Sequence, residues 1–548
     1  MSRPTRFTSE MIDAYVKLGY WTAETTLDLM ERHAQRQPDK VAIVDPHHRL
    51  TWKEVGEVIN RFAGVLHALD LDRDTPVIVQ LPNSVEDCLM RFALKKLGLL
   101  GAYIPVVWGR RELEAVVDVL KPGALIVPEF FRNTDMLAIA CDMKDLHPGL
   151  QLVVVGPGGR SGDYIRLPPA LKTSRAFPDT VDFQARAFGP FEVSKLVVTS
   201  GSTGTPKIVE RPEQQSLLWG KGLTKLLNLT SEDIVGGFVP FSGGPGYFTW
   251  AGWLVSGARL VLSDGFAPQN LLSLIEREQV TVVMTAPAVL ARIVDFPMLP
   301  DYNVQAVRAV RTGAANLPRA VAEKAEDLLG CLVLKAGGSM ETGSFGQIST
   351  RDPQSIRLGP SIGKVMEGGE ICVVDSEGQA LPTGSPGELW VRGPATSSGY
   401  FSDREATARA WGTLGPEGWF RTGDIATIDG EGNVSLIGRI KEMINRGGTN
   451  IFPVELESLL TEHPKILEAA VVGIPDATLG EVPCLCVLTL EGIKLTLDEV
   501  IVFLSVRGLA RHKYPTCLLV LEDFPRGQTM RVNRRKLAEQ AIAVIDRC

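Results

Sequence analysis

Short runs of apolar, β-branched residues alternate with amphipathic segments through the first four hundred residues of the chain. The runs at residues 41–44 and 77–80 are each followed by a helical pattern, at residues 52–69 and 84–97. Further strands are expected at residues 124–127, 152–155, 196–198, 260–262, 280–284 and 332–335. Alternation of strands and helices is typical of parallel sheets covered by helices, because each parallel connection needs a crossover that a helix supplies. The pattern therefore predicts an α/β fold.

The length of the chain and a change of pattern near residue 438 indicate two domains. A chain of 548 residues is longer than one hydrophobic core usually serves. Beyond residue 434 a compact α+β pattern follows, with helices expected at residues 454–462, 497–509 and 534–545 and strands at residues 466–472, 483–490 and 517–521. We therefore expect a large N-terminal domain at residues 1–437 and a small α+β domain at residues 438–548.

Charge and composition argue against several classes of function. The net charge of −7 and the lack of a basic block make a nucleic-acid partner unexpected. The first residues lack the apolar segment of a signal peptide, and no run of about 18 uninterrupted apolar residues predicts a membrane span. The eight cysteines show no metal-ligand spacing, which favours reduced thiols in a cytoplasmic protein. If Cys484 and Cys486 lie in a strand, their thiols share one face.

The motif with the clearest chemical meaning lies at residues 199–207, directly after the strand expected at residues 196–198. Its glycines let the backbone approach an anion, and its five hydroxyl groups and successive N–H groups can donate to phosphate oxygens. The Walker pattern is not matched, and a plain turn is the alternative. The preceding strand and the density of hydroxyl groups favour a phosphate loop. Its candidate binding residues are Thr199, Ser200, Gly201, Ser202, Thr203, Gly204 and Lys207.

This loop resembles the signature loop of the adenylate-forming superfamily, which comprises acyl-CoA synthetases, nonribosomal-peptide adenylation domains and luciferases. Further segments resemble motifs of that superfamily in the same order, at residues 337–342, 387–393, 419–424, 438–442 and 445–448. The resemblance covers essentially the whole chain, and its opening (Phe7, Thr8 and residues 19–21) is similar to the aryl-acid-activating branch. The resemblance implies a large α/β domain and a small mobile C-terminal domain that rotates about Lys441.

The resemblance also implies roles for the matched residues. Thr199 and Lys207 would act on the phosphates, Glu341 would hold Mg²⁺, and Asp424 would accept both ribose hydroxyls. Cations are needed because charge develops when a carboxylate attacks the α-phosphate of ATP. The remaining residues that the resemblance assigns to nucleotide binding are Gly313, Ala314, Gly338, Ser339, Met340, Thr342 and Arg439. Taken alone, Glu341 is typical of a solvated surface residue and Asp424 of a turn or a helix cap.

The chain departs from the superfamily pattern in two places. The catalytic lysine of the last motif falls on Arg531, and Met530 replaces the glycine that precedes it. Arginine keeps the charge but presents a planar fork. Either Arg531 bridges carboxylate and phosphate with altered geometry, or another cation such as Lys513 serves. A histidine that is frequent after the strand near residue 240 is absent, because none occurs between His147 and His463.

The expected acid pocket consists of Phe241, Ser242, Gly243, Gly244 and Gly337. Amino-acid-activating relatives place an aspartate in this region, and Ser242 cannot supply that charge, so an α-amino acid is not expected. Gly337 takes the place of a residue that is usually aromatic, and the glycines leave room or flatten the walls. A flat aromatic or alicyclic acid is expected, with a long fatty acid left open. Phe241, Tyr247 and Phe248 fit core packing equally well.

The predicted reaction begins with ATP, Mg²⁺ and a small carboxylic acid and gives acyl-AMP and pyrophosphate. A thiol, either of CoA or of a carrier protein, then displaces AMP. Two alternatives stay open. Arg531 and the missing histidine motivate adenylation with an unusual acid or an amine acceptor. A catalytically weak nucleotide-binding or partner-binding homologue is the other alternative. The identity of the acid and the formation of a homodimer are also left open.

Overall fold

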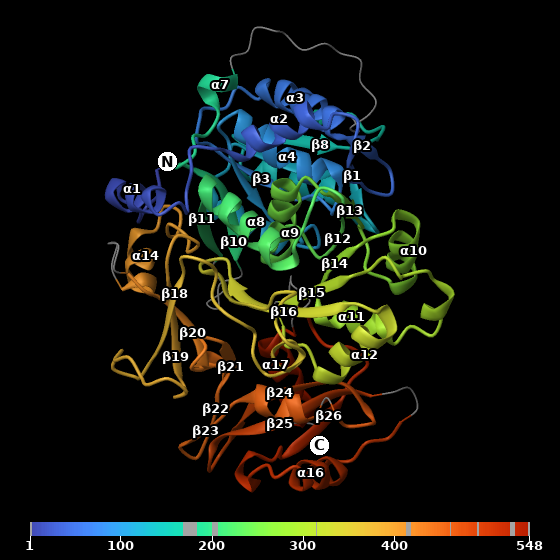
Figure 1. Ribbon diagram of the computed structural model, residues 1–548, viewed down its shortest axis with the longest axis vertical. Coiled ribbons are helices and arrows are strands. Elements are labelled where there is room, and N and C mark those ends of the chain that lie inside the picture. The colour runs from blue at the N-terminus through green and yellow to red at the C-terminus, as the bar shows by residue number, and fades with distance from the viewer. Residues whose placement is uncertain are drawn as a thin grey trace.

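The chain folds into a large part built on two sheets and a small part, coloured dark orange to red in Figure 1, that ends the chain. The computed structural model describes residues 3–167, 183–199, 206–313, 315–412, 418–460, 462–489, 493–526 and 532–545. None of the helices in these ranges is both long and apolar enough to span a bilayer.

The first sheet has the strand order β17-β16-β15-β14-β12-β13-β1-β2. The pairings from β1 to β16 are parallel, and the edge strands β2 and β17 pair antiparallel. The strands are β1 (Val41–Val44), β2 (Arg49–Thr51), β12 (Ile234–Phe238), β13 (Arg259–Leu262), β14 (Val282–Thr285), β15 (Ala309–Gly313), β16 (Leu332–Ser339) and β17 (Gly343–Gln347). The four strands predicted in this region are confirmed, although β14 begins at Val282 and β16 continues to Ser339.

The second sheet has the strand order β11-β10-β4-β3-β5-β8-β9 and is parallel except for the hairpin of β10 and β11. Its strands are β3 (Pro76–Val79), β4 (Leu100–Tyr103), β5 (Ala124–Pro128), β8 (Gln151–Val155), β9 (Ile165–Leu167), β10 (Val193–Thr199) and β11 (Lys207–Pro212). The strands predicted at residues 77–80, 124–127, 152–155 and 196–198 are confirmed here. This sheet ends in the hairpin that carries the predicted phosphate loop.

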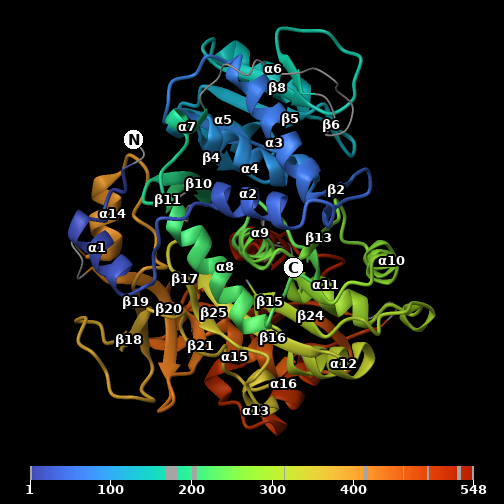
Figure 2. The ribbon, with the colours of Figure 1, turned by 45° about the horizontal axis from the view of Figure 1, so that its top comes forward.

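Helices fill the space between the two sheets and cover their outer faces. The inner helices share one core with strands of both sheets, and Figure 2 shows α8 and α9 in this layer. They are α2 (Thr26–Arg36), α3 (Trp52–His67), α4 (Val85–Lys96), α8 (Glu213–Leu227) and α9 (Gly244–Ser256). The outer face of the first sheet packs against α10 (Pro268–Glu278), α11 (Pro287–Val294) and α12 (Arg319–Leu329). The outer face of the second sheet packs against α5 (Arg110–Leu120) and α6 (Met136–Leu146).

Helix α3 illustrates why the sequence forms these elements. Thr51 accepts a hydrogen bond from the backbone of Glu54, and the Glu54 carboxylate accepts one from the backbone of Thr51, which closes a capping box. Val55, Ile59 and Phe62 then recur at helical spacing and are buried. Because one stripe of the helix is apolar, it packs against the core and leaves its charged residues outside.

A third, antiparallel sheet that the sequence analysis did not predict follows the two large sheets. Its strands are β18 (Glu370–Val374), β19 (Gly387–Arg392), β20 (Phe420–Ile428) and β21 (Val434–Arg439). It carries the motifs of residues 387–393 and 419–424 on the neighbouring strands β19 and β20. In Figure 1, α14 (Arg404–Trp411) and the N-terminal α1 (Ser9–Lys17) lie beside this sheet.

The C-terminal part is a sheet with helices on both faces, which confirms the α+β class predicted for it. It contains β22 (Ile444–Arg446), β23 (Thr449–Ile451), β24 (Ile466–Asp476), β25 (Gly480–Thr489), β26 (Cys517–Val520), α15 (Pro453–Leu460), α16 (Leu497–Val506) and α17 (Arg534–Ile545). Helices α15 and α16 pack on one face, and α17 packs on the other. Cys484 and Cys486 both face the core beneath α17, which confirms that the two thiols share one face.

Short elements complete the described part of the chain. They are β6 (Phe130–Phe131), β7 (Thr134–Asp135), α7 (Phe183–Arg186), α13 (Gln354–Arg357) and the 3-10 helices η1 (Leu299–Asp301), η2 (Ile440–Glu442) and η3 (Arg511–Lys513). Of these, η2 matters for the site, because it connects the third sheet to the C-terminal part.

Candidate functional site

The β10–β11 hairpin holds both ends of the predicted phosphate loop. Thr199 and Lys207 are paired across the two strands, and the Thr199 hydroxyl donates to the Lys207 carbonyl oxygen at 3.3 Å. The loop residues between them, Ser200, Gly201, Ser202, Thr203 and Gly204, lie outside the described residues. The antiparallel pairing of β10 and β11 thus holds Lys207 at the end of the predicted loop.

Glu341 lies on the turn that joins β16 to β17. The Ser339 hydroxyl oxygen accepts hydrogen bonds from the backbone of Glu341 and of Thr342, each at 3.2 Å. The Thr342 hydroxyl in turn accepts one from the backbone of Ser339 at 3.1 Å. Gly343 closes the turn with φ of +71°, in the left-handed region that favours glycine. Two short hydroxyl side chains therefore fix the backbone from which the carboxylate projects.

Tyr400 brings the lysine and the glutamate together. Its hydroxyl donates to Glu341 Oε1 at 3.2 Å, and Lys207 Nζ lies 4.9 Å from the centre of its ring. The backbone of Phe401 donates to Ile208 of β11 at 2.7 Å, which fixes the segment that carries Tyr400. Burial and the charge of Glu341 raise the pKa of Tyr400, so the hydroxyl stays a donor at neutral pH.

The sequence analysis missed Tyr400. The signal that was available is its place in a hydroxyl- and glycine-rich segment, residues 396–400, shortly after the motif of residues 387–393. The structure shows that the backbone of Ser397 in this segment donates to the carbonyl oxygen of Glu341 at 2.6 Å. The segment thus contacts the Glu341 turn through backbone and side chain alike.

Asp424 and Arg439 form a second polar centre on neighbouring strands of the third sheet. They are directly opposite each other in β20 and β21, and Arg439 Nε lies 2.7 Å from Asp424 Oδ1. The Asp424 side chain is buried, and the Thr422 hydroxyl accepts a hydrogen bond from its backbone at 3.0 Å. The structure therefore unites two residues that were predicted separately. A buried carboxylate held by an arginine is a suitable acceptor for sugar hydroxyls.

The expected acid-pocket residues lie where β12 runs into α9. Phe241 is buried, its backbone N–H donates to Asn83 Oδ1 at 3.0 Å, and its carbonyl oxygen accepts from Arg91 Nη2 at 3.1 Å. Ser242 and Gly243 follow it, and a side chain at Gly244 would meet Met340 Sδ at 3.1 Å. The start of α9 thus faces the turn that carries Glu341.

Gly337 does not leave open space on its side-chain side. A Cβ atom there would lie 2.4 Å from Ile362 and 3.1 Å from Phe345. Of the two expected effects of this glycine, extra room is wrong, because other apolar side chains take the volume, and a flatter wall stays a prediction. At Gly338 a Cβ atom would lie 2.2 Å from the Gly343 carbonyl oxygen, so the hairpin itself requires glycine. Tyr247 is buried in an aromatic cluster with Trp219 and Trp250, as expected of core packing.

The other predicted residues are distributed as follows. Gly313 ends β15 beside Ala336 of β16, whereas Ala314 lies outside the described residues. Lys441 is exposed on η2. Arg531 also lies outside the described residues. Its alternative, Lys513, is held by both carboxylate oxygens of Glu455 at 2.7 Å, so its charge already has a partner.

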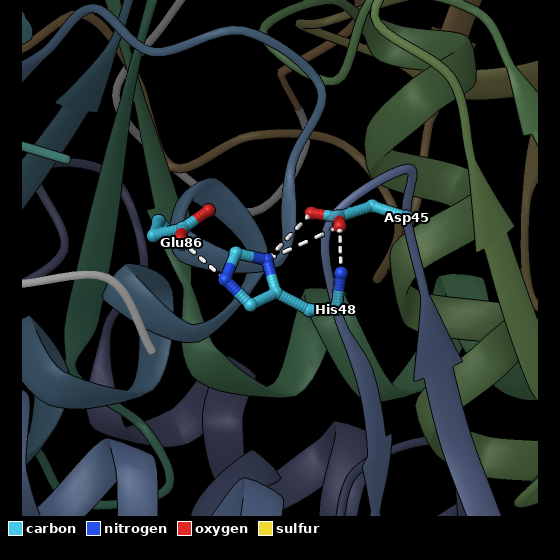
Figure 3. Close-up of side chains that lie close together, drawn as sticks. All are labelled: Asp45, His48 and Glu86. Atoms are coloured by element: carbon cyan, nitrogen blue, oxygen red, sulfur yellow. Dashed lines mark hydrogen bonds and ion pairs between the residues drawn. The ribbon is translucent and has the colours of Figure 1, made fainter. Parts of the chain in front are cut away.

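A group of potential metal ligands that the sequence analysis did not single out lies near α4 (Figure 3). The Asp45 carboxylate accepts hydrogen bonds from the backbone N–H groups of His47, His48 and Val85 and from the His48 ring. The other ring nitrogen, His48 Nε2, lies 3.5 Å from Glu86 Oε1. The hydrogen bond to Asp45 raises the pKa of His48, with Glu86 adding to the effect. Burial raises the pKa of Asp45, but the hydrogen bonds outweigh it and lower the net value. The two carboxylates therefore favour the protonated form of His48 over the neutral one.

Two protein-family models match parts of this chain. The family described as AMP-binding enzyme matches residues 30–401, and the AMP-binding enzyme C-terminal domain matches residues 455–530. The chain is 29% identical over 536 residues to 2-hydroxy-7-methoxy-5-methyl-1-naphthoate–CoA ligase of Streptomyces carzinostaticus, covering 96% of this chain and 95% of that one. It is 30% identical over 536 residues to medium-chain fatty-acid–CoA ligase of Escherichia coli (strain K12), covering 96% of this chain and 92% of that one.

A solved structure supports the likeness of fold. The crystal structure of an anthranilate CoA ligase in complex with anthranoyl-AMP superimposes with a TM-score of 0.82 at 23% identity, covering 95% of this chain and 98% of the other.

Proposed function

Since the chain belongs to the AMP-binding enzyme family, we propose that it joins a small aromatic or alicyclic carboxylic acid to the thiol of CoA through an acyl-AMP intermediate. It is an ATP-dependent ligase that forms acyl-AMP and transfers the acyl group to a thiol; the two relatives described above are both named CoA ligases. The observation that carries the assignment of residues is the convergence of Lys207 and Glu341 on Tyr400.

In the first step we assign the phosphates of ATP to the loop between Thr199 and Lys207. Attack by the acid on the α-phosphate builds negative charge, which Lys207 stabilises from the rim of the loop. Asp424, buried and oriented by Arg439, accepts the ribose hydroxyls and so fixes the nucleotide relative to the acid. The start of α9, held through Phe241, forms the wall against which the acid lies.

The residues at the Glu341 turn fit a magnesium ion. Mg²⁺ prefers oxygen ligands and is usually bound by one or two carboxylates together with substrate phosphates. Glu341 offers a carboxylate on a fixed turn, next to the end of the phosphate loop, and the Tyr400 hydroxyl orients it. When bound, the ion would neutralise phosphate charge. The role of the protein is to hold the carboxylate in place before ATP arrives.

For the thiol step we propose that the small domain, residues 438–548, turns about Lys441. The glycine pair Gly447 and Gly448 forms the tip of the β22–β23 hairpin, with φ of +58° and +86°. Such a hairpin is stiff at its strands and has little bulk at its tip, which suits a part that enters the active site after rotation. We retain Arg531 as the candidate cation from this domain in the adenylation step.

The test is pyrophosphate release with ATP and Mg²⁺ across a panel of aromatic, alicyclic and fatty acids, with and without CoA. We expect release that depends on one class of acid, and mass spectrometry should show its CoA thioester. The test variant is Glu341→Gln, which keeps the side-chain shape but removes the charge, and the control is Arg351→Met, which changes an exposed cation that is not among the residues assigned to the site. Release by Glu341→Gln equal to that of the wild type would contradict the magnesium assignment. An amide product with an amine, and no thioester, would contradict CoA as the acceptor.

A further inference from the structure

Arg311 is a buried cation without a polar partner among the residues that the structure describes. It lies in β15 with 6% of its surface exposed, and its Nε is fully buried without a hydrogen bond. Its guanidinium lies 5.4 Å from the centre of the Phe248 ring. Burial lowers the pKa of Arg311 to about 10, so the group is still charged at neutral pH. A buried charge of this kind destabilises a protein unless something compensates it.

Other buried cations of the same core are compensated by carboxylates. Arg91 Nη2 lies 2.8 Å from Asp87 Oδ2, and Lys95 Nζ lies 2.7 Å from Glu213 Oε2. Because the protein pairs these charges internally, the lack of a carboxylate at Arg311 is a property of that position and not of the core in general.

Two further buried cations, Lys195 and Arg211, have no carboxylate partner among the described residues. Other groups lie close enough to compensate their charge. Lys195 Nζ lies 3.2 Å from the centre of the Tyr247 ring, close enough for a cation–π contact. Arg211 lies 4.0 Å above Trp219 and also donates to Gln215 Oε1 at 2.8 Å. Buried nitrogens of Lys195 and Arg211 also lack hydrogen bonds, but within the described ranges Arg311 has neither a ring contact as short as theirs nor a hydrogen-bond acceptor.

The position of Arg311 connects it to the acid pocket. Alternate residues of a strand point to the same face, so Arg311 shares a face with Gly313, about 6.6 Å further along β15. Its strand neighbours Met284 and Leu334 belong to the same core as α9, where Phe248 lies. Arg311 therefore lies two residues before Gly313, which is assigned to the nucleotide, on the face of the sheet that α9 covers.

Gln347 adds a second unpaired polar group on this face. It pairs with Ala336, which pairs with Gly313, so the three residues lie side by side on β17, β16 and β15. Its Oε1 is buried and receives no hydrogen bond from any described residue. Buried polar groups that lack partners are rare in native proteins, and two on one wall point to a polar ligand.

We propose that Arg311 binds a second carboxylate of the acid substrate, so that the preferred substrate is a dicarboxylic acid with one end adenylated and the other end paired with Arg311. This inference rests on the proposed function, since it concerns the acid that the same site activates. A guanidinium matches a carboxylate with two parallel N–H···O hydrogen bonds, which explains why an arginine is placed there. Gln347 supplies further polar contact at the same wall.

The experiment compares acids that share a skeleton and differ by one carboxylate. The pairs are benzoate and terephthalate, cyclohexanecarboxylate and cyclohexane-1,4-dicarboxylate, and hexanoate and adipate, with pyrophosphate release as the readout. We expect kcat/KM to be at least about 30-fold higher for the diacid in one pair, because a buried charged hydrogen-bonded pair is worth at least about that factor. A preference for the monoacid in every pair overturns the inference and leaves the proposed function intact. No release with any acid overturns both.

Variants of Arg311 separate binding from folding. Arg311→Met should lose at least about 30-fold in kcat/KM for the diacid, mainly through KM, and Arg311→Lys should lose less because it keeps the charge. Without acid, Arg311→Met should melt at a higher temperature than the wild type, because a buried unpaired charge is gone. The exposed control Arg351→Met should change neither quantity. If Arg311→Met lowered the melting temperature and reduced activity with both members of each pair equally, the role would be structural and the inference wrong.

Discussion

Tyr400→Phe tests the link between the β10–β11 hairpin and Glu341, the proposed magnesium ligand, because it removes one oxygen atom and leaves the ring. The lost interaction is the hydrogen bond from the Tyr400 hydroxyl to Glu341 Oε1 at 3.2 Å. The ring packs with Trp411 at 5.7 Å between centres and lies 4.9 Å from Lys207 Nζ, and both contacts remain in the phenylalanine variant. Any change can therefore be assigned to the orientation of Glu341.

The size of the effect follows from the chemistry of that hydrogen bond. Hydrogen bonds to charged groups contribute about 1.5–3 kcal/mol. Glu341 is only half-buried, so water can replace part of the lost interaction and the lower figure applies. About 1.5 kcal/mol corresponds to a roughly tenfold loss of kcat/KM. Since the ring stays packed, the melting temperature should change little.

The assay measures pyrophosphate release at a series of Mg²⁺ concentrations with the preferred acid. We expect the variant to need more Mg²⁺ for half-maximal rate and to be about tenfold slower at limiting Mg²⁺. Tyr400→Leu should be slower still, because it also removes the ring that contacts Lys207. Equal rates for Tyr400→Phe and the wild type at every Mg²⁺ concentration would refute the proposed role of the hydroxyl.

Three further predictions concern other residues. Asp424→Asn keeps the shape but loses the charge that faces Arg439, and calorimetry should show ATP binding weakened by about 10- to 100-fold. Arg531→Ala should slow adenylation at least tenfold, whereas Lys513→Ala should not, because Lys513 is paired with Glu455; the opposite result in single-turnover measurements would reverse the assignment. His48→Gln should destabilise the fold by about 1 kcal/mol at pH 6 and by less at pH 9 in denaturant titrations. The sign follows because a raised pKa gives stability that is complete below pH 6.5 and lost as the pH rises through the folded value, and an equal loss at both pH values would contradict it.

Several strands of the two large sheets, such as β1, β3, β5 and β8, could be predicted from the sequence because they are short, mostly apolar and separated by helical patterns. Parallel strands covered on both faces leave this signature, and β3 and β5 appear within a residue or two of the expected bounds. The third sheet could not be predicted in the same way. In β19 and β20 buried residues are mixed with half-exposed polar ones, since one face of an antiparallel sheet meets solvent, and the motifs there were recognised without their strands.

The site shows a similar division. Glu341, Asp424 and Lys207 lie in motifs with a recognisable order of residues, so resemblance was enough to select them. Tyr400 and Arg311 have no such motif, and their importance depends on distances that only the fold creates. The 3.2 Å contact of Tyr400 with Glu341 joins residues 59 positions apart in the chain. Among the described residues Arg311 has no carboxylate partner, whereas the core places Asp87 beside Arg91. Neither property is encoded in the spacing of residues along the chain.

If the small domain turns as proposed, the ion pairs of Arg439, just before η2, and of Glu442, its last residue, indicate where. Arg439 is tied to Asp424 across β20 and β21, so the chain up to that residue would move with the large domain. Glu442 is tied to Arg534 Nε at 3.1 Å, and Arg534 also holds Glu457 at 2.6 Å, so the chain from Glu442 onward would move with α15 and α17. Only the backbone of residues 440 and 441 separates the two anchors. A rotation that keeps both ion pairs must therefore be absorbed by the dihedral angles at these two positions, which supports Lys441 as the pivot.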